Sequence, residues 1–365
     1  MSPIFLTHDT ARRFWQLTTD PNRWKRSRRI TWPRDTPTSP TRTSLDEAIL
    51  ALDKMGVMEL GKPIDVLVDS DASRRHIPGI TCHICKASLP ENSFVRIAPG
   101  IFVASPELLF VQEVARLDFP NTVLLGFEFC GRYSVPPIRN LSLLEHQDQT
   151  AAEDFRNRGF FNRPPISSVE RLSAFLAKTK RLHGKKNALD AIPHILNESA
   201  SPMESVCAML LCLPVFRGGF GIEQPLLNAR VDMKGKLAPL AAFGSYECDM
   251  LWPQANLAIE YDSELEHSGE RRIAKDSRKR ADLAAANISV ITVTKQQVMG
   301  VASMEQIARK VAKLTGKRIR KGTFGLTDAR IALRKAILWD RLNRLKHERW
   351  EEQRRLTGSA QHPAP

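Results

Sequence analysis

The sequence predicts a mixed α/β protein with two folded domains: a small α+β domain, then a mixed sheet flanked by helices. Two observations carry this prediction. Short β-type runs between Gly and Pro turns occupy the first third of the chain, and a helix, three strands, a helix and a strand follow one another after residue 201. With 365 residues, the chain is also too long for one average domain. The expected organisation is a basic arm over 1–43, an α+β domain over 44–134, a helical connection over 135–200, a sheet domain over 201–316, and a basic C-terminal helix and tail over 317–365.

Positive charge is concentrated at the two ends of the chain. Of the formal net charge of +14, residues 12–43 carry +7 and residues 305–365 carry +10, whereas 44–304 is slightly acidic. Charge clustered in this way favours a polyanionic partner, DNA first. The alternatives are a solubilising charge and contact with a lipid surface. Without a secretory pattern or a run of 18 apolar residues, we expect a cytoplasmic protein that does not enter the membrane.

In the first half of the chain, four prolines among Arg, Thr and Ser make 21–43 a flexible arm or extended segment. Helical spacing of apolar residues begins at Ser44 and ends before Gly56. Short strands are expected at 64–68, 80–84, 94–97 and 101–103, a helix from 105, a helix or strand from about 121, and helices at 167–179 and 187–196.

In the second half, Ser201 and Pro202 predict the start of a helix, with Glu204 at its third position. Strands are expected at 227–232, 245–252, 256–262 and 288–294, and helices at 270–286 and 303–314. A long basic helix from Thr327 to about Arg355 carries an apolar seam that could pair with another helix.

Two of the six cysteines, Cys82 and Cys85, form a CxxC motif near His76. A structural zinc ion needs four ligands, and the sequence has no second CxxC or HxxxH to complete the set. Two thiols in a strand are therefore the favoured interpretation, with zinc as the alternative.

The segment 246–262 carries the residues with the most distinctive chemistry. A turn at Pro253–Asn256 joins two β-type runs, and a symmetric hairpin would place Asp249 opposite Glu260 and Glu247 opposite Asp262. Strand alternation then predicts one face with four carboxylates and an apolar face on the other side. Clustered carboxylates repel one another, and Mg²⁺ or Mn²⁺ would relieve the repulsion. The alternative is a solvated face whose acids pair with Arg271, Arg272 or Lys275.

Glu204, Asp249 and the run Glu260–Asp262 resemble the helix–strand–strand motif of PD-(D/E)XK nucleases. More closely, 219–293 resembles a bacterial family of unknown function related to very-short-patch repair endonucleases. The resemblance lies in Gly221 with Gln224-Pro225, the Asp249 strand, "IEYDSELEH" (259–267) and "DSRKRADLAAANISVITVT" (276–294). It covers about a quarter of the chain. The segment 94–115 is similar, more weakly, to an abortive-infection antitoxin region that precedes such nuclease domains.

The resemblance implies a restriction-endonuclease-like fold that holds Mg²⁺ or Mn²⁺ through Asp249 and Glu260, with the Tyr261 carbonyl as a third ligand. Glu204 would contact the metal ion through a water molecule, although a Glu at the third position of a helix also has a capping role. Asp262 and His267 complete the implied catalytic set, with His267 as general base, phosphate contact or plain polar surface. Asp262 occupies the position of the superfamily's Lys, for which Lys275 or Arg271 would have to substitute.

The first functional hypothesis is a metal-dependent DNA endonuclease that hydrolyses phosphodiester bonds. On the helix that follows the acidic segment, Asp276 is expected to pair with Arg280 and therefore to take no part in this chemistry. Phosphate contacts are expected from Arg271, Arg272, Lys275, Arg278 and Lys279. The second hypothesis is a non-catalytic, antitoxin-type DNA-binding regulator with a degenerate nuclease fold. The third is an interaction protein that pairs through the helix over 327–355.

Overall fold

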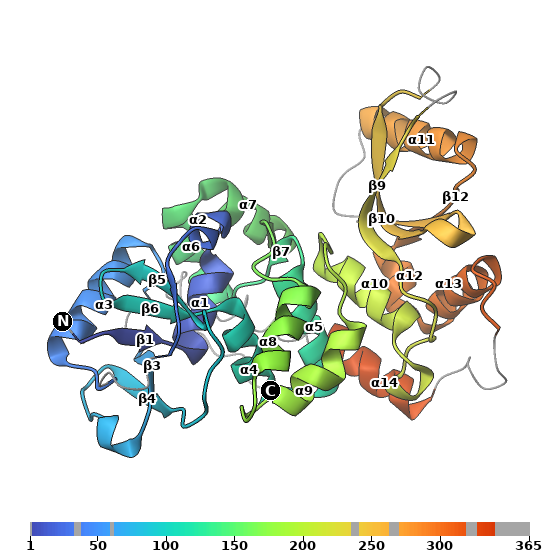
Figure 1. Ribbon diagram of the computed structural model, residues 1–365. Coiled ribbons are helices and arrows are strands. Elements are labelled where there is room, and N and C mark those ends of the chain that lie inside the picture. Colours follow the sequence, from blue (N-terminus) through green and yellow to red (C-terminus); the bar gives the residue numbers. More distant parts are fainter. Residues whose placement is uncertain are drawn as a thin grey trace, which may run out of the picture. The chain divides into compact units, whose positions relative to one another are not determined.

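The computed structural model describes residues 2–32, 38–58, 62–234, 241–262, 270–318 and 327–339, without the side chains of 25 and 270–275. The chain divides into two compact units, unit 1 over Met1–Ile195 and unit 2 over Leu196–Arg341. Both combine helices with sheets, which confirms the mixed α/β class (Figure 1).

Unit 1 is built on a mixed sheet with the strand order β2-β5-β6-β1-β3-β4. The first strand of the chain lies inside this sheet, because Ile4 pairs in parallel with Ile101 of β6 and Leu6 pairs antiparallel with Val66 of β3. The four strands expected between 64 and 104 are confirmed. The strands are β1 (Ile4–Leu6), β2 (Arg29–Ile30), β3 (Ile64–Val68), β4 (Ile80–Ile84), β5 (Phe94–Ala98) and β6 (Ile101–Ala104).

The predicted basic arm over 1–43 was wrong for most of its described residues. Phe5 on β1 is 1% exposed and packs edge-on against Trp32 and Phe94, with ring centroids 4.9 and 5.0 Å apart. Trp24 is also buried. Burial of these aromatic side chains stabilises the folded segment, although its composition is mostly polar.

The helices of unit 1 extend through the predicted helical connection. Of the helix and the strand expected as alternatives from about 121, the structure has the helix, α5. Its Gly126 lies so close to Ile195 that a Cβ there would approach the Ile195 Cδ1 to 2.1 Å. Residues 135–195 therefore belong to the first domain. Its helices are α1 (His8–Leu17), α2 (Asn22–Lys25), α3 (Arg42–Lys54), α4 (Pro106–Val114), α5 (Phe119–Cys130), α6 (Leu141–Gln147), α7 (Gln149–Arg158), α8 (Val169–Lys178) and α9 (Lys185–Ala191), with a small β7 (Tyr133–Ser134) and β8 (Phe161–Asn162) pair.

Unit 2 has the predicted order of helix, three strands, helix and strand. Its four-stranded sheet has the order β12-β11-β10-β9, with antiparallel pairs except between β11 and β12. Figure 1 shows α11 alongside these strands, and Leu283 of that helix packs into the core cluster of the sheet. The elements are α10 (Pro202–Cys212), β9 (Leu226–Asp232), β10 (Ser245–Trp252), β11 (Leu257–Asp262), α11 (Glu270–Ala285), β12 (Ser289–Thr294), α12 (Lys295–Met299) and α13 (Val301–Leu314).

The predicted basic helix from Thr327 is described only at its start, and 340–365 lie outside the described residues. There α14 (Asp328–Arg334) begins at a Thr327 cap and continues into one π-helical turn over Lys335–Trp339. Its arginines are buried in unit 2: Arg334 donates to the carbonyls of Val298 and Met299, each at 2.7 Å. Among the described residues, no helix is both long and apolar enough to cross a membrane.

Candidate metal and nucleic-acid site

Asp249 on β10 and Glu260 on β11 lie where the two strands stop pairing. The strand pairing runs from Trp252↔Leu257 to Met250↔Ile259 and ends just before Asp249 and Glu260, the two residues that the sequence analysis expects to face each other. Asp249 Oδ2 instead accepts a hydrogen bond from the backbone N–H of Tyr261 at 2.6 Å. The carboxylate therefore takes the place of a strand carbonyl at the point where the hairpin opens.

Asn228 on β9 faces the same position from the other side. The β9–β10 register pairs Ala229 with Cys248 and Leu227 with Met250, with Asn228 and Asp249 between them. Asn228 has φ +46, a left-handed conformation that Asn tolerates better than most residues. A left-handed residue inside a strand locally disrupts the ladder, as in a β-bulge. The strand is therefore irregular where Asp249 needs room.

The predicted face with four carboxylates was wrong. Cys248, predicted to lie on the face opposite Glu260, lies beside it, and the negative charge of Glu260 contributes to raising the pKa of this thiol to about 12, after burial. Cys248 also shares one core cluster with Leu251 and Ala258, although strict alternation would separate residues 248 and 251. The alternation of faces is broken at Asp249, opposite the left-handed Asn228, although the register between β9 and β10 is the same on both sides of this pair.

Glu204 reaches this region from the first turn of α10, after the predicted Ser201 cap, whose hydroxyl accepts the Glu204 N–H at 3.1 Å. Its carboxylate is 6% exposed, and one oxygen, Oε2, accepts from the Ala200 N–H at 2.9 Å and from Asn228 Nδ2 at 2.8 Å. Asn228 Nδ2 also donates to the Glu198 carbonyl at 2.8 Å. The Ser201 hydroxyl caps the helix, but Glu204 accepts from the residue before the cap and so does not close a capping box. The charge of Asp249 acts on the Glu204 carboxylate.

Glu260 has a cationic neighbour that comes from the helix following its strand. The ammonium of Lys279 on α11 forms an ion pair with Glu260 Oε2, and both side chains are about one-fifth exposed. The other oxygen, Oε1, is buried and has no hydrogen-bond partner among the described residues, beyond the weak thiol donor beside it. This site is therefore short of donors on one carboxylate oxygen.

Burial, with negative charge nearby, raises the pKa values of all three carboxyl groups. Burial, then the charge of Asp249, raises the pKa of Glu204 to about 7 and that of Glu260 to about 7. Burial also raises the pKa of Asp249, opposed by the Tyr261 N–H and by Lys279. Asp249 thus links the other two electrostatically, and Lys279 offsets only part of the negative charge.

The carboxylates fit a divalent cation in part. Within the described residues, no group of three or more His, Cys, Asp or Glu side chains is placed to hold a metal ion directly. The unpartnered Glu260 Oε1 and the adjoining Asp249 are hard oxygen donors, the kind that Mg²⁺ and Mn²⁺ prefer with water completing the shell. Glu204, bonded to two N–H donors, suits a contact through water.

The other predicted site residues are less well placed or lie outside the description. Asp262 is exposed at the end of β11, where it pairs with Thr294 of β12, and Glu247 is exposed opposite Arg230. Arg278 is exposed on α11. His267 lies outside the described residues, and so do the side chains of Arg271, Arg272 and Lys275.

The CxxC motif of unit 1 is part of a strand end. Cys82 lies on β4 and Cys85 directly after it, and their thiols point to the carbonyls of Arg75 and Ala87, at 3.6 and 3.9 Å. Burial raises the pKa of Cys85, so this thiol stays protonated at neutral pH.

Two residues of the site were missed by the sequence analysis, Asn228 entirely and Lys279 in its role. Comparisons of the chain with protein-family models, with curated proteins and with solved structures find no match. The function is therefore inferred from the site itself.

Proposed function

We propose that unit 2 is a metal-dependent DNA endonuclease domain of the PD-(D/E)XK type, which hydrolyses phosphodiester bonds. The observation that supports this most is that Glu204, Asp249 and Glu260, from a helix and two strands, form one largely buried group in which the charge of Asp249 raises the pKa of the other two. Buried like charges are costly in a purely structural role, and groups with shifted pKa values gather at functional sites.

Asp249 and Glu260 would hold Mg²⁺ or Mn²⁺, which when bound polarises a phosphoryl oxygen and lowers the pKa of water. Asp249 is oriented for this by the Tyr261 N–H, which holds Oδ2 at 2.6 Å. Glu204, fixed by Asn228 and Ala200, would orient water beside Asp249. These hydrogen bonds hold both carboxylates in place before substrate arrives, and such preorganisation favours catalysis.

Lys279 is our candidate for the lysine that Asp262 replaces in the strand motif. Its ammonium forms an ion pair with Glu260, although Lys279 lies on α11, seventeen positions after Asp262 in the sequence. A cation there would neutralise charge that develops on the phosphate. Lys279 was expected to contact phosphate as one of a basic group, and its ion pair with Glu260 brings that role into the site.

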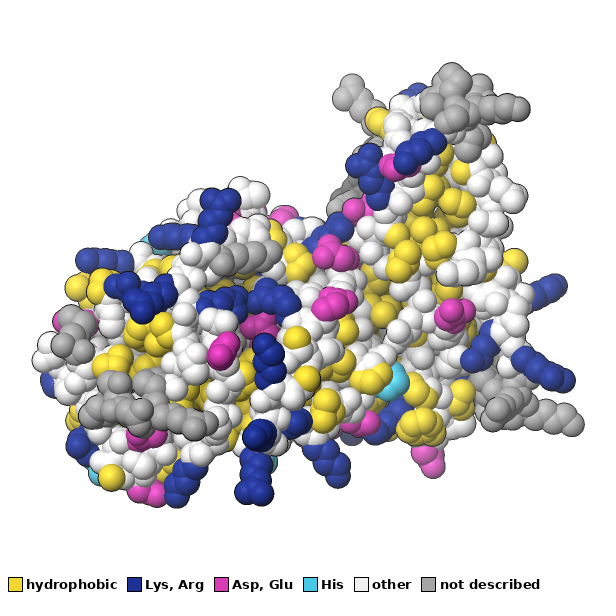
Figure 2. Space-filling view, in the orientation of Figure 1, with side chains coloured by type: hydrophobic (Ala, Val, Ile, Leu, Met, Phe, Trp, Pro, Cys, Tyr) yellow, Lys and Arg dark blue, Asp and Glu magenta, His cyan; other side chains and the backbone are white. Residues whose placement is uncertain are grey.

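The described basic residues offer a dispersed rather than a continuous surface for DNA. Figure 2 shows Lys and Arg side chains on the visible face singly or in small groups, with acidic side chains among them. Arg330 and Arg334 are buried, so they are not available for phosphate. Arg278 is exposed on the same helix as Lys279 and is the described residue best suited to a backbone contact.

Nicking of supercoiled plasmid by the purified protein tests the proposal. We expect nicking with Mg²⁺ or Mn²⁺, none with EDTA, and loss of at least about 100-fold in rate for Asp249→Asn. Asp232→Asn is the matched control, because Asp232 is an exposed carboxylate of the same sheet with its own ion pairs to Arg230 and Lys234. Cleavage that survives Asp249→Asn, or that Asp232→Asn abolishes equally, would contradict the site assignment.

The ion pair itself favours a second candidate, a DNA-binding regulator with a degenerate nuclease fold. Lys279 already neutralises one oxygen of Glu260, so that part of the site is compensated without a cation. This candidate predicts DNA binding that weakens steeply with salt, no cleavage, and no Mn²⁺ bound by the wild-type protein. Mn²⁺ electron paramagnetic resonance, with Asp249→Asn as reference, separates the two.

A further inference from the structure

One short segment of unit 1 concentrates positive charge that is otherwise dispersed over the described surface. It joins α8 to α9 and spans residues 178–186, with the sequence KTKRLHGKK. Five of its nine residues are Lys or Arg, and none is Asp or Glu. We call this segment the basic loop. It lies within 44–304, which is slightly acidic as a whole, so the net charge of that long stretch conceals it.

The backbone of the basic loop is held against α4. Gly184 has φ +92, and a Cβ there would lie 2.0 Å from the Val111 carbonyl oxygen, so the loop approaches α4 this closely only with glycine at this position. Directly after the loop, Asn187 Nδ2 donates to the Val114 carbonyl at 2.9 Å. The conformation of the loop is therefore fixed by unit 1 itself, which reduces the ordering cost of binding a partner.

One of the five cations holds the loop together, and the other four are exposed. The Lys185 ammonium donates to the Thr179 carbonyl on the other side of the loop. Figure 2 shows Lys and Arg side chains that project from the surface around the position of α8 and α9. The exposed cations of the loop are Lys178, Lys180, Arg181 and Lys186, with His183 exposed among them.

The four exposed cations have little compensating negative charge. None of them forms an ion pair with a residue that the structure describes. The nearest acid along the chain is Asp190, one helical turn after Lys186 on α9. Even with Asp190 included, the segment 178–190 has five positive charges against one negative. This surface therefore attracts anions.

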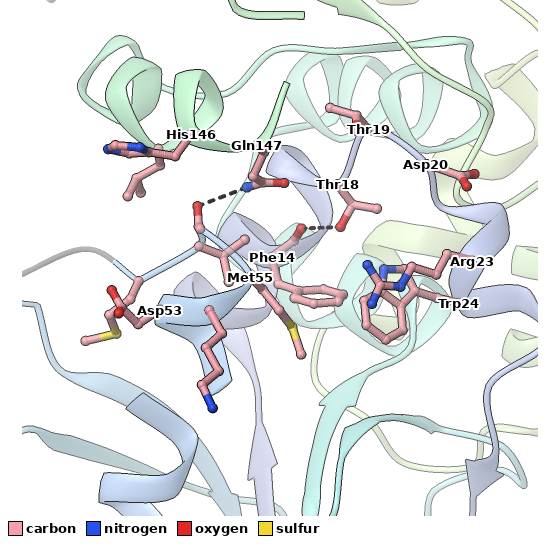
Figure 3. Close-up of a pocket in the computed structure, with 15 residues that line it drawn as sticks. Phe14, Thr18, Thr19, Asp20, Arg23, Trp24, Asp53, Met55, His146 and Gln147 are labelled. Carbon is pink, nitrogen blue, oxygen red and sulfur yellow. Dashed lines mark hydrogen bonds between the residues drawn. The ribbon is translucent and has the colours of Figure 1, made fainter. Parts of the chain in front are cut away.

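The cavity of unit 1 in Figure 3 has no such excess of charge. Its volume is about 650 Å³, and its lining includes Asp20 and Asp53 together with Arg23 and Lys54. Figure 3 shows Asp20 close to Arg23 at one side and Asp53 at the other. Because acids and bases balance in this lining, the cavity does not favour an anionic ligand, whereas the basic loop does.

We propose that the basic loop binds the sugar-phosphate backbone of duplex DNA. Duplex DNA carries one negative charge per roughly 1.7 Å of its axis, so several exposed cations on one loop meet several phosphates at once. Contacts of Lys and Arg to phosphates fix the position of a duplex without reading its sequence. The choice of DNA among polyanions rests on the proposed function of unit 2, but the loop belongs to unit 1. It gives that unit a DNA-binding surface other than the basic arm predicted over 1–43.

Fluorescence anisotropy of a labelled duplex tests the proposal, with the full chain in EDTA so that metal-dependent cleavage does not occur. The double variant Lys180→Gln with Arg181→Gln removes two of the four exposed cations. Each phosphate contact contributes about 0.9 to the slope of log K against log salt concentration. We therefore expect the slope to decrease by about 2 and the affinity to fall about 60-fold at roughly 0.1 M salt.

Two control variants accompany this measurement. Arg74→Gln with Arg75→Gln removes the same charge from two neighbouring arginines of unit 1 that are also exposed, and should leave the slope unchanged. Arg181→Lys keeps the charge of the loop and should retain the wild-type slope. A slope that the double variant of the loop leaves unchanged would overturn the proposal, and so would an equal decrease in the Arg74 and Arg75 control.

An anionic membrane is the competing partner for a loop of this charge. If the double variant loses binding to phosphatidylserine vesicles but keeps its binding to the duplex, the partner is a membrane and the proposal is wrong. Asp249→Asn should bind the duplex as the wild type does, because the assay contains no free metal ion. Duplex binding through the loop without nicking by the wild type would contradict the nuclease proposal alone. Nicking with unchanged KM by the double variant would contradict the loop proposal alone.

Discussion

Asn228 offers the sharpest test of how the site is built. Asn228→Ala removes two buried hydrogen bonds of 2.8 Å, one to the Glu204 carboxylate and one to the Glu198 carbonyl. These contribute about 1.5–3 and about 1 kcal/mol. Alanine at φ +46 adds about 1–2 kcal/mol of backbone strain. We expect the free energy of unfolding to fall by about 4 kcal/mol, and Asn228→Gly, which adopts this φ freely, to lose about 1 kcal/mol less.

Urea denaturation at pH 7 measures both variants against wild type, with the midpoint and the slope m recorded for each. Asn228→Asp is the third member of the series, because it keeps the shape and the tolerance of a positive φ but places a second acid beside Glu204. It should be closer to wild type at pH 5 than at pH 8, since the two acids share a proton at the lower pH. A loss below about 1 kcal/mol for Asn228→Ala, or no difference between the Ala and Gly variants, would refute this account of Asn228.

Three further predictions concern other parts of the fold. Burial, with the stacked ring of His83, lowers the pKa of His8 from 6.5 to about 4 in the folded state. The folded protein is therefore destabilised as pH falls from 6.5 toward 4. His8→Asn, which tolerates the φ of +44, should reduce that loss of stability by about 2 kcal/mol, measured by urea titrations at pH 7 and 4.5. The same loss in the variant as in wild type would contradict this prediction. Gly218→Ala should lower the free energy of unfolding by more than about 2 kcal/mol, measured by thermal unfolding, because φ is +92 and the new Cβ would lie 2.3 Å from the Ala329 carbonyl oxygen. Gly244→Ala is the neutral control, because a Cβ at Gly244 would have nothing within 4 Å. Arg334→Met should lower the unfolding midpoint by the equivalent of about 2 kcal/mol, because the carbonyls of Val298 and Met299 lose their donor. Arg309→Met, at an exposed position, is the control. Equal effects of the two changes would show that the α14 contact is dispensable.

Much of unit 2 could be predicted because its strands are short, regular and bounded by clear turns. The alternation through Trp252 and the Pro253 turn located β10 and β11 almost to the residue. The break in the alternation of faces at Asp249 could not be predicted in the same way, because the left-handed residue opposite it, Asn228, lies on another strand. A left-handed Asn inside a strand leaves no trace in hydrophobic periodicity. Only the preference of Asn for positive φ could have drawn attention to it.

The lysine of the site illustrates a different limit. Lys279 is one of several basic residues on α11, and the sequence shows no reason to prefer it over Lys275. Lys279 points to Glu260 because it lies on the face of α11 that packs against the sheet. Leu283, one turn later on the same face, is part of the core cluster of that sheet. In unit 1 the error had the opposite cause. The arginines and prolines of 1–43 suggested an arm, but Phe5 and Trp32 of this segment are buried in unit 1.

The position of β1 inside its sheet has a consequence for how unit 1 folds. Its parallel partner β6 lies about a hundred residues farther along the chain, with Ile4 opposite Ile101. At a synthesis rate of roughly 5–20 residues per second, β1 waits on the order of 5–20 s before that partner exists. Closing a loop of this length is also slow compared with forming local helices. Only its antiparallel partner β3, with Val66 opposite Leu6, is synthesised before β6, so this central strand is completed on both sides only when both later segments are present.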